Sequence, residues 1–585
     1  MIVITGAGII SAIGNNKEAV WSSLKGECCG ISAPRYLETS HSQLPVGEVK
    51  MSNRELAELC GVSQEECTRT ALLGIVALRE ALQQAGIGQD ETASMALISG
   101  TTVGSMDKTE RDYLSCGSVD VIGDCETSTL QMASKVGDFG YITTCSTACS
   151  SAANAFIVGA ELIRSGLYSK VAVGGTEALS KFHLNGFNSL MILDREICRP
   201  FDATRAGLNL GEGAAFMVLE TLESAMERGA TPLALLSGWG NACDAFHQTA
   251  TSAQGEGGYL SMSKALECAK LTPAEIDYIN AHGTATPNND SSEANAIKRL
   301  FGEQVPLFSS TKSLTGHTTS ASGSIEMVIS LLAMQHSFVP ANHNWSKGMD
   351  EGLTPVAKGM EGVELNHILC NSFGFGGNDT TLILSKFNNS TSTKDSYNCK
   401  RLEQIKAHIV CAVDYNSIAP EEMPAIPPMA ARRMKGMLKR ALVTSLVALN
   451  RAGNPLPDAI ITGTGLGCVE ETLAFLNEIY RNGEQLLKPT CFMNSTHNTI
   501  GSLIAIHTGN HGYNNTYSQG GDSLYSALLD ALLQISLGEI ESALVGWHES
   551  AGERSVALYV TKYSENGGEE LRMDNIKEIC GRYCL

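Results

Sequence analysis

The chain has 585 residues, of which 43% are hydrophobic and 18% charged, and its formal net charge is −20 at pH 7. This length predicts two to four domains with an ample core. The acidic balance disfavours a nucleic-acid partner, because the phosphates would be repelled. The longest apolar runs are too short and too often interrupted by polar residues to predict a membrane span.

The eighteen cysteines are scattered along the chain, without the dense spacing of a disulfide framework or a zinc-binding array. We therefore expect no metal site, and mostly buried thiols in a reducing compartment. The chain opens with MIVITGAGIISAIGNN, which predicts a strand and a glycine turn rather than a basic leader. We expect no signal peptide and a cytoplasmic location.

Strand-like apolar runs alternate with helix-like patterns along the whole chain. The runs include residues 1–5, 96–99, 171–173, 214–219 and 380–384. Such alternation predicts an α/β layered fold. Residues 386–400 are polar, rich in Asn, Ser and Thr, and without periodicity, which predicts a linker between a first domain at 1–385 and a second at 401–585.

The second domain repeats segments of the first in the same order. ALLGIVALREALQQAG, which starts at residue 71, matches ALVTSLVALNRAG from residue 441, and LISGTTVGSMDKT from 97 matches IITGTGLGCVEET from 460. TTCSTACSSAANAF from 143 matches NTYSQGGDSLYSAL from 515. Three collinear matches at similar offset predict that the second domain is a partial, diverged copy of the N-terminal half of the first.

The third match contrasts Cys149 in the first copy with Gly521 in the second. Apolar residues after Cys149 recur on one helical face, so the thiol lies at or just before a helix N-terminus. The free N–H groups and the dipole at that end lower a thiol pKa, and a thiolate suits acyl transfer. The alternative is a core cysteine. Cys145 is a rival nucleophile, although we predict it on the preceding strand.

Three later segments carry further polar and glycine-rich patterns. Taken singly, they would be a histidine in a polar turn, a lysine-containing loop and a glycine turn. NAHGTATPNND holds His282, Thr284, Thr286 and Asp290; STKSLTGHTTSASGSIE holds Lys312, His317 and Glu326; NSFGFGGND holds Phe373, Phe375, Gly376 and Gly377. In this order behind a cysteine at a helix start, they resemble the β-ketoacyl synthase family of the thiolase superfamily, across residues 1–385.

The resemblance implies an α/β thiolase-like fold, a five-layer αβαβα sandwich of two similar halves. Residues of about 1–230 would form the half with the nucleophile, and 231–385 the half with the histidines. The smaller domain at 401–585 would be half-thiolase-like. The family is usually homodimeric, so we expect a homodimer or a heterodimer with another synthase-like chain. No cofactor is expected, since phosphopantetheine enters on the acyl carrier protein.

The resemblance also implies a role for each site residue. Cys149 would take the acyl group, and His282 and His317 would donate to the enolate oxygen that forms when a malonyl thioester loses carbon dioxide. The backbone N–H groups of Cys149 and Phe375 would form the oxyanion hole for the acyl carbonyl, with Phe375 also a gate. Lys312 would orient the site, with Glu326 and Asp290 in support. Thr284 and Thr286 would hydrogen-bond the phosphopantetheine arm.

Two features depart from the family pattern. Asn378 and Asp379 follow the glycines where the family has Thr and Asn, and we expect the added carboxylate near the entrance of the site. The segment at 103–141 looks shorter than its family counterpart. Because that segment shapes the acyl pocket in relatives, the sequence does not predict a chain length.

The second domain lacks a cysteine at the nucleophile position and has none of the three later motifs. His497, in STHNT, does not correspond to a catalytic histidine of the family. Ser523 is an alternative nucleophile for which no base can be named. We therefore predict a non-catalytic half-synthase, similar to the chain-length-factor arrangements of polyketide, aryl polyene and flexirubin-type pathways.

The resulting functional prediction is decarboxylative condensation of an enzyme-bound acyl group with malonyl-acyl carrier protein. The product is 3-oxoacyl-acyl carrier protein, in fatty acid synthesis or, preferably, in specialised polyene or polyketide synthesis. The alternative is a non-catalytic subunit that binds acyl chains or determines their length. A degradative thiolase would need a second active-site cysteine in a CxG loop, and Cys370 lacks those glycines.

Overall fold

A computed structural model describes the chain except residues 120–121, 389–404, 429–433, 435, 564–566 and 584–585. Most of the linker predicted at 386–400 lies outside the described residues. None of the helices in the described part of the chain has the length and apolarity needed to cross a membrane.

The N-terminal half of the first domain is a five-stranded sheet between helices. Its strands lie in the order β3-β2-β4-β5-β1. Their bounds are β1 Ile2–Ser11, β2 Ala96–Gly100, β3 Tyr141–Cys145, β4 Lys170–Glu177 and β5 Gly213–Thr221. Helices α3 (Arg69–Ala85) and α5 (Cys125–Val136) cover one face, and α6 (Ser151–Arg164) covers the other.

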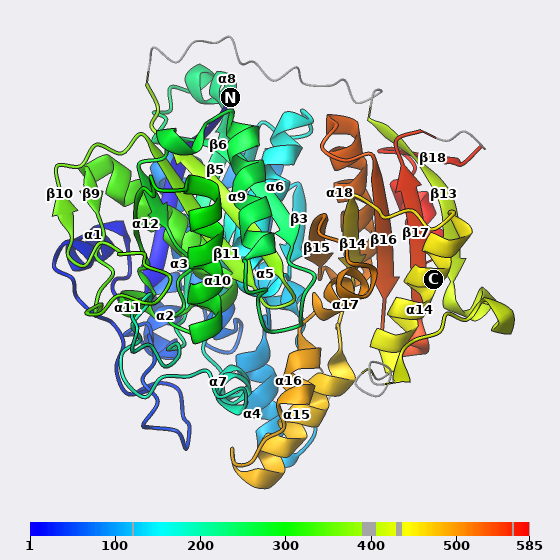
Figure 1. The fold of residues 1–585 in the computed structure, drawn as a ribbon, viewed down its shortest axis with the longest axis horizontal. Helices are drawn as coiled ribbons and strands as arrows, with labels where there is room; N and C mark the ends of the chain where they lie inside the picture. Colours follow the sequence, from blue (N-terminus) through cyan, green and yellow to red (C-terminus); the bar gives the residue numbers. More distant parts are fainter. Residues whose placement is uncertain (120–121, 389–404, 429–433, 435, 564–566, 584–585) are drawn as a thin grey trace.

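The C-terminal half adds a second sheet, in the order β6-β12-β11-β7-β8. Its strands are β6 Ala234–Cys243, β7 Tyr278–Asn280, β8 Leu307–Ser309, β11 His367–Gly374 and β12 Asn378–Ser385. Helix α12 (Ser322–His336) lies beside α6 and contacts both sheets, whereas α9 (Glu256–Ala269) and α10 (Pro287–Phe301) lie outside. The five-layer order helix, sheet, helix, sheet, helix agrees with the predicted fold (Figure 1).

Shorter elements complete the first domain and lie mostly around the site. They are α1 Lys17–Lys25, α2 Asn53–Cys60, α4 Met106–Cys116, α7 Lys181–Ser189, α8 Leu222–Glu227, α11 Lys312–Thr315, β9 Phe338–Val339 and β10 Met360–Glu361.

The second domain reproduces the strand order of the first half. Its sheet runs β15-β14-β16-β17-β13-β18, with the same parallel and antiparallel pairings as β3-β2-β4-β5-β1 up to β13. The strands are β13 Lys406–Asp414, β14 Ala459–Gly463, β15 Tyr513–Tyr517, β16 Ser542–His548, β17 Ser555–Thr561 and β18 Glu569–Arg572. The predicted repeat is therefore confirmed at the level of strand topology.

Helices of the second domain also follow the first copy. Helices α14 (Gly436–Arg451) and α17 (Thr499–Thr508) cover one face of the sheet, and α18 (Ser523–Leu537) covers the other. Helices α15 (Val469–Asn482) and α16 (Pro489–Ser495) extend away from the sheet, and α15 contacts α4 and α7 of the first domain. Figure 1 shows this helical group in orange and blue below the sheets.

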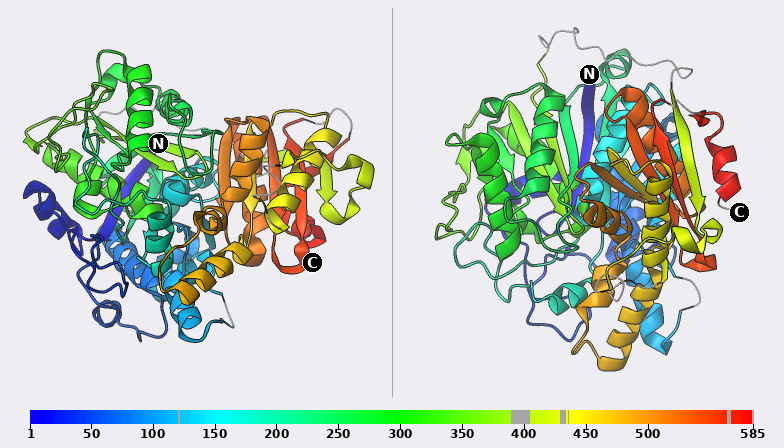
Figure 2. Two further views of the ribbon diagram at one scale, coloured as in Figure 1. Left: turned by 60° about the horizontal axis from the view of Figure 1, so that its bottom comes forward. Right: turned by 45° about the vertical axis from the view of Figure 1, so that its right-hand side comes forward.

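The two domains join through their equivalent strands β3 and β15. Tyr517 pairs with Cys145 in antiparallel register. The N–H of Ser146 donates to the Thr516 carbonyl at 2.8 Å, and the N–H of Ser518 donates to the Thr144 carbonyl at 2.9 Å. Because each copy makes the same contact with the other, the two are related by a pseudo-two-fold axis. Because β1 also pairs with β6, hydrogen bonds connect the two sheets of the first domain and the sheet of the second in one continuous order of sixteen strands among the described residues (Figures 1 and 2).

Strand β18 and the C-terminal helix contact the second domain where β6 and α12 contact the equivalent elements of the first. In the first domain β1 pairs with β6 of the second half, whereas β18 covers the free edge of the equivalent strand β13. Helix α19 (Ile576–Tyr583) packs on α18, as α12 packs on α6. Ile576 and Ile579 are fully buried there. The segment therefore closes an edge that would otherwise be open to aggregation.

Replacing Ile579 by Ala should destabilise the second domain by about 3 kcal/mol, because a buried branched side chain is removed from a packed helix interface. Thermal unfolding followed by hydrogen exchange of β13 and α18 measures the change. Lys577→Ala, on the exposed face of the same helix, is the control and should shift stability by less than about 0.5 kcal/mol. Equal stability of the two variants would contradict this role of α19.

Candidate active site

The turn that carries Cys149 joins the end of β3 to the start of α6. Ala148 has φ +53°, a left-handed conformation that is unusual for a residue other than glycine. Ser151 fixes this turn: its hydroxyl donates to the Ala148 carbonyl at 2.6 Å and accepts the Thr147 N–H at 2.9 Å. Cys149 is thereby held at the helix start, as predicted, and Cys145 ends the strand.

His317 lies directly against the Cys149 thiol. Its Nε2 is 3.1 Å from the sulfur, and its Nδ1 is 3.0 Å from the Ser322 hydroxyl. The His317 backbone is held at the other end, where its N–H donates to the Asn209 carbonyl at 2.7 Å. The imidazole is therefore oriented toward the sulfur from two sides.

His282 lies perpendicular to His317, with the ring centroids 5.3 Å apart. Its Nδ1 is 3.4 Å from the Nζ of Lys312, which forms a buried ion pair with Glu326. Because an ammonium group can only donate, Nδ1 accepts and the proton of the neutral ring is assigned to Nε2. Lys312 thus makes His282 a donor toward the space beside Cys149.

Burial decides the protonation of the three groups. It lowers the pKa of both His282 and His317 well below the usual value, with the Lys312 charge acting in the same direction. Burial also raises the pKa of the Cys149 thiol to about 12, although the Lys312 charge and the backbone N–H groups of Phe375 and Cys149 lower it. At neutral pH the free site therefore holds a thiol beside two neutral imidazoles.

The backbone N–H groups of Phe375 and Cys149 both lower the pKa of the Cys149 thiol. They are the two groups that the sequence analysis assigned to the oxyanion hole, and this assignment stays a prediction. The Phe375 ring lies stacked on Phe187, with the centroids 5.6 Å apart. The arrangement offers fixed donors where charge would develop on a thioester oxygen.

Thr284 and Thr286 lie on the loop that leads into α10, and Asp290 lies in the first turn of that helix. The two threonine hydroxyls are 3.0 Å apart, and Thr286 caps the helix through the Asn289 N–H. The Asp290 carboxylate accepts the N–H groups of Phe201 at 2.7 Å and Ala285 at 3.1 Å. Asp290 thus fixes the loop that holds the two threonines, and none of its hydrogen bonds among the described residues reaches the Cys149 thiol.

The two residues that depart from the family pattern are both buried. Asn378 Oδ1 accepts from the Ser150 hydroxyl and the Asn154 amide, each at 2.8 Å. Asp379 was expected near the entrance, and this expectation is wrong. Its side chain is 2% exposed and lies against Gly257, close enough to Asp244 for the two carboxylates to repel each other. Burial and these neighbours raise its pKa well above the usual value, so it adds no charge at the entrance.

Sequence reasoning missed two residues that orient the site. The Glu293 carboxylate accepts the N–H of His282 and of Gly283, each at 2.8 Å, and so fixes the histidine backbone. Asn498 of the second domain donates to the Phe375 carbonyl at 2.7 Å. Glu293 lies one helical turn after Asp290, a spacing that could have indicated it; no motif indicated Asn498.

The second domain repeats the nucleophile turn without a nucleophile. Gly521 replaces the cysteine, and Gly520 repeats the left-handed conformation of Ala148. The Ser523 hydroxyl accepts the Gln519 N–H at 2.8 Å and donates to the Gly520 carbonyl at 2.8 Å, as Ser151 does in the first copy. Ser523 is fully buried. These contacts explain Ser523 as a structural residue and give it no features of a nucleophile.

A small cavity lies between the two domains beside the Cys149 turn. Its volume is about 30 Å³, and Thr102, which lines it, donates to the Ala148 carbonyl at 3.3 Å. His183 and Phe182 of the first domain face His497 and Phe492 of the second across it. The Phe492 ring also lies against Gly186, where a Cβ would come within 2.2 Å. The space holds roughly one water molecule, so aromatic side chains fill most of this region.

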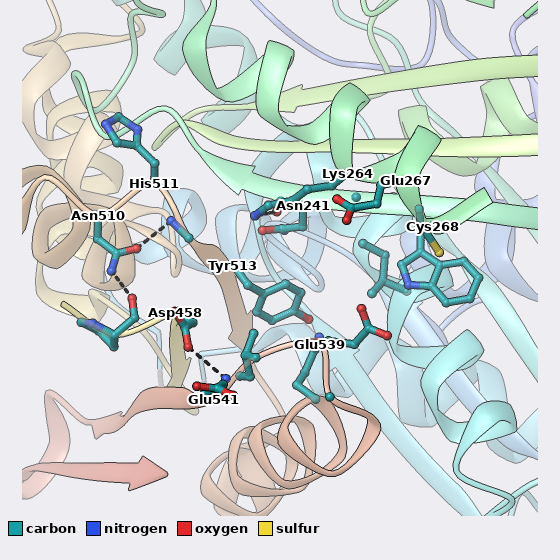
Figure 3. A pocket seen from close by; sticks show the side chains of 18 of the residues that line it. Asn241, Lys264, Glu267, Cys268, Asp458, Asn510, His511, Tyr513, Glu539 and Glu541 are labelled. Atoms are coloured by element: carbon teal, nitrogen blue, oxygen red, sulfur yellow. Dashed lines mark hydrogen bonds between the residues drawn. The ribbon is translucent and has the colours of Figure 1, made fainter. Parts of the chain in front are cut away.

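A larger groove of about 810 Å³ opens elsewhere between the domains (Figure 3). Lys264, Glu267 and Cys268 line one wall, and Asp458, Asn510 and Glu541 the other. The second wall comes from residues at the amino ends of β14, β15 and β16, whereas Cys149 follows the carboxyl end of β3. None of the predicted site residues lines this groove.

The burial of Cys149 predicts slow alkylation near pH 7 and a rate that rises with pH through pH 10 without a plateau, because only the thiolate reacts. Iodoacetamide labelling followed by mass spectrometry of the Cys149 peptide measures it. Lys312→Met removes the charge that lowers the thiol pKa and should slow labelling by roughly tenfold. The exposed-lysine control Lys25→Met should leave the rate unchanged. A plateau below pH 8 would contradict the assignment.

Family models match most of the chain. A β-ketoacyl synthase N-terminal domain matches residues 1–225, the C-terminal domain matches 233–346, and a further β-ketoacyl synthase N-terminal domain matches 407–553. The last match independently supports the repeat.

Among curated relatives, 3-oxoacyl-[acyl-carrier-protein] synthase 2 of Staphylococcus aureus (strain COL) is 32% identical, over 66% of this chain and 98% of the relative. Synthase 1 of Haemophilus influenzae is 34% identical, over 66% and 99%.

Among solved structures, the ishigamide ketosynthase/chain length factor has 30% identity and a TM-score of 0.62, covering 66% of this chain and 99% of that chain. The PfaC keto synthase-chain length factor has a TM-score of 0.79 and covers 96% of this chain and 78% of that one; at 15% identity this likeness shows the fold alone. The matched models and the curated relatives together show that the chain belongs to the β-ketoacyl synthase family.

Proposed function

We propose that the chain condenses an acyl group bound to Cys149 with a malonyl unit carried by acyl carrier protein, and releases 3-oxoacyl-acyl carrier protein and carbon dioxide. The observation that carries the proposal is the 3.1 Å contact between the Cys149 sulfur and His317 Nε2, beside a His282 ring whose tautomer Lys312 fixes. The curated relatives, named 3-oxoacyl-[acyl-carrier-protein] synthases, support it.

In the first step the Cys149 sulfur attacks the thioester carbonyl of an acyl carrier protein. The bond between that carbon and the carrier sulfur breaks, and the proton of Cys149 leaves with the carrier thiol. His317 accepts the thiol hydrogen bond and is placed to relay this proton. The N–H groups of Phe375 and Cys149 stabilise the tetrahedral oxyanion. Thr284 and Thr286 hydrogen-bond the phosphopantetheine arm.

In the second step a malonyl thioester loses carbon dioxide, and its electrons form an enolate. His282 and His317 donate hydrogen bonds to the enolate oxygen, and burial keeps both rings neutral. Once Cys149 is acylated it has no S–H, so His317 can carry its single proton on Nε2 while its Nδ1 accepts from the Ser322 hydroxyl. The enolate carbon attacks the acyl carbonyl, and the carbon–sulfur bond to Cys149 breaks, so that the sulfur leaves as a thiolate. This thiolate takes up one proton from solvent, which regenerates the thiol. Residues of the site thus supply the nucleophile and the hydrogen-bond donors of both steps, phosphopantetheine arrives on the carrier substrate, and one proton is consumed for each carbon dioxide released.

We place the reaction in specialised polyene or polyketide-type synthesis, with the second domain as a non-catalytic partner of the first. The reciprocal contacts of β3 and β15 support this, because the second domain occupies the position of a symmetry-related subunit. The resemblance of the first domain to a structure named as a ketosynthase/chain length factor points the same way. The second domain would then shape the acyl pocket.

The aromatic cluster between the domains supports a limit on acyl length. Phe492 of the second domain packs against Phe182 and Phe187, with centroids 5.7 and 5.5 Å away. Since the remaining cavity holds about one water, a long acyl chain must displace these rings. Phe492 therefore sets the length of acyl chain that Cys149 accepts.

Mass spectrometry of carrier-bound products tests the reaction. Wild type, mixed with acyl and malonyl carrier proteins, should give a 3-oxo product two carbons longer, and Cys149→Ala should give none because the acyl acceptor is lost. Cys116→Ala, at an exposed thiol, should retain the product. No product from wild type over a panel of starters, with no acyl adduct on Cys149, would overturn the proposal in favour of a non-catalytic chain-binding subunit.

Replacing Phe492 by Ala should lengthen the acyl groups that load onto Cys149, because the ring that closes the cavity is removed. Competition between acyl carrier proteins of different chain length, read by intact mass, gives the preference. A shift of at least two carbons is expected. Tyr563→Ala, at an exposed aromatic, should keep the wild-type preference. An unchanged preference in Phe492→Ala would remove the second domain from length selection.

A further inference from the structure

The loop that holds Phe375 is clamped by the second domain. The Asn498 side-chain amide donates to the Phe375 carbonyl at 2.7 Å, and Asn498 itself is 1% exposed at the start of α17. The following residue, Gly376, has φ +87°, and a Cβ there would lie 2.1 Å from the Ser502 hydroxyl. The Gly376 N–H donates to the Gln248 carbonyl at 2.7 Å. The second domain therefore holds this loop on one side, and Gln248 of the first domain holds it on the other.

Phe375 connects this clamp to the nucleophile. The Phe375 N–H is one of the groups that lower the pKa of the Cys149 thiol. The Phe375 carbonyl accepts the hydrogen bond from the Asn498 amide. The two groups belong to consecutive peptide units, so their relative direction depends on the φ and ψ angles of Phe375 alone. A donor that fixes the carbonyl therefore also fixes where the N–H points.

The side chain of Phe375 reaches the same segment of the second domain. Its ring stacks on Phe187, and Phe187 packs against Phe492 with the centroids 5.5 Å apart. Phe492 precedes Asn498 by six residues, in and just after α16. The main chain and the side chain of Phe375 are thus both supported by residues 492–498.

Stability alone does not account for this arrangement. Asn498 Oδ1 and the Ser502 hydroxyl are buried, and neither has a hydrogen-bond partner among the described residues. Buried unpaired polar atoms are rare because they cost free energy. An apolar residue would avoid the unpaired oxygen, but it would lose the donor to Phe375.

We propose that Asn498 is a positioning residue for the condensation at Cys149: its amide holds the Phe375 carbonyl, so that the Phe375 N–H stays aimed at the reacting thioester. The inference rests on the proposed function for its kinetic part. It assigns the second domain a role in the chemical step itself, beyond the length of the acyl chain.

The pseudo-symmetry of the chain offers a matched control. Glu126 is the equivalent residue of the first domain, and it lies beside Gly520 in the turn that has no nucleophile. Substituting Glu126 perturbs the same element on the side without chemistry. A general effect of disturbing the domain interface would appear in both variants, whereas a positioning effect would appear only in the variant of Asn498.

The experiment compares Asn498→Asp and Asn498→Ala with Glu126→Gln in the full chain. Asn498→Asp keeps the size of the side chain but cannot donate when ionised. Both Asn498 variants should lower kcat for condensation about tenfold, with an unchanged KM for the carrier proteins. This decrease is smaller than the roughly 10²–10³-fold decrease in kcat that follows complete loss of an oxyanion donor. Glu126→Gln should behave as wild type. Wild-type kcat in both Asn498 variants would overturn the inference.

Alkylation of Cys149 by iodoacetamide gives a readout that needs no turnover. If Asn498 aims the Phe375 N–H at the sulfur, its loss raises the thiol pKa, and labelling at pH 8 to 10 should slow by several fold in both variants. An unchanged labelling profile in folded Asn498→Asp would contradict the inference even if wild type failed to condense. The failure of the proposed function is thereby distinguished from the failure of this role.

Discussion

The antiparallel contact of β3 with β15 is the constraint on which the rest of the structure depends. It joins the last residue of each strand, Cys145 and Tyr517, directly before the turns that carry Cys149 and Gly521. Two reciprocal backbone hydrogen bonds fix its register. The position of every second-domain residue relative to the thiol follows from it, including Asn498 and Phe492. A covalently attached half-copy therefore does the structural work that a second subunit performs in a symmetric dimer.

The two copies have diverged in chemistry while retaining the same backbone. The left-handed residue, the short 3₁₀ turn and the serine whose hydroxyl bonds to that turn recur in both copies. Among the described residues, only the first copy has a cysteine in the turn and histidines packed beside it. The second copy ends its sheet with β18 and covers α18 with the short helix α19. The second domain contributes to the surroundings of the site through α16 and the start of α17, where Phe492 packs on Phe187 and Asn498 donates to the Phe375 carbonyl.

Local motifs predicted the groups that the fold brings together around Cys149, and burial accounts for the direction of the pKa shifts of Cys149 and the two histidines. The sequence analysis found these groups in short segments whose order resembles that of the family: Cys149, His282, Lys312 and His317. The repeat was predicted from three aligned segments. Asp379 shows the limit: its charge is evident in the sequence, but its burial against Gly257 depends on packing between β12 and α9. Asn498 and Phe492 could not be predicted, since their roles arise only where residues of two domains meet across the interface.

The central claim is that one chain contains one reactive site, completed by a copy that does not react. The most direct measurement is the stoichiometry of acyl loading: intact mass of the full chain after incubation with an acyl carrier protein, followed by peptide mapping. We predict one acyl group per chain, bound as a thioester on the peptide that contains Cys149 and absent from residues 406–583. A second acyl group, or one located on the second domain, would contradict this account.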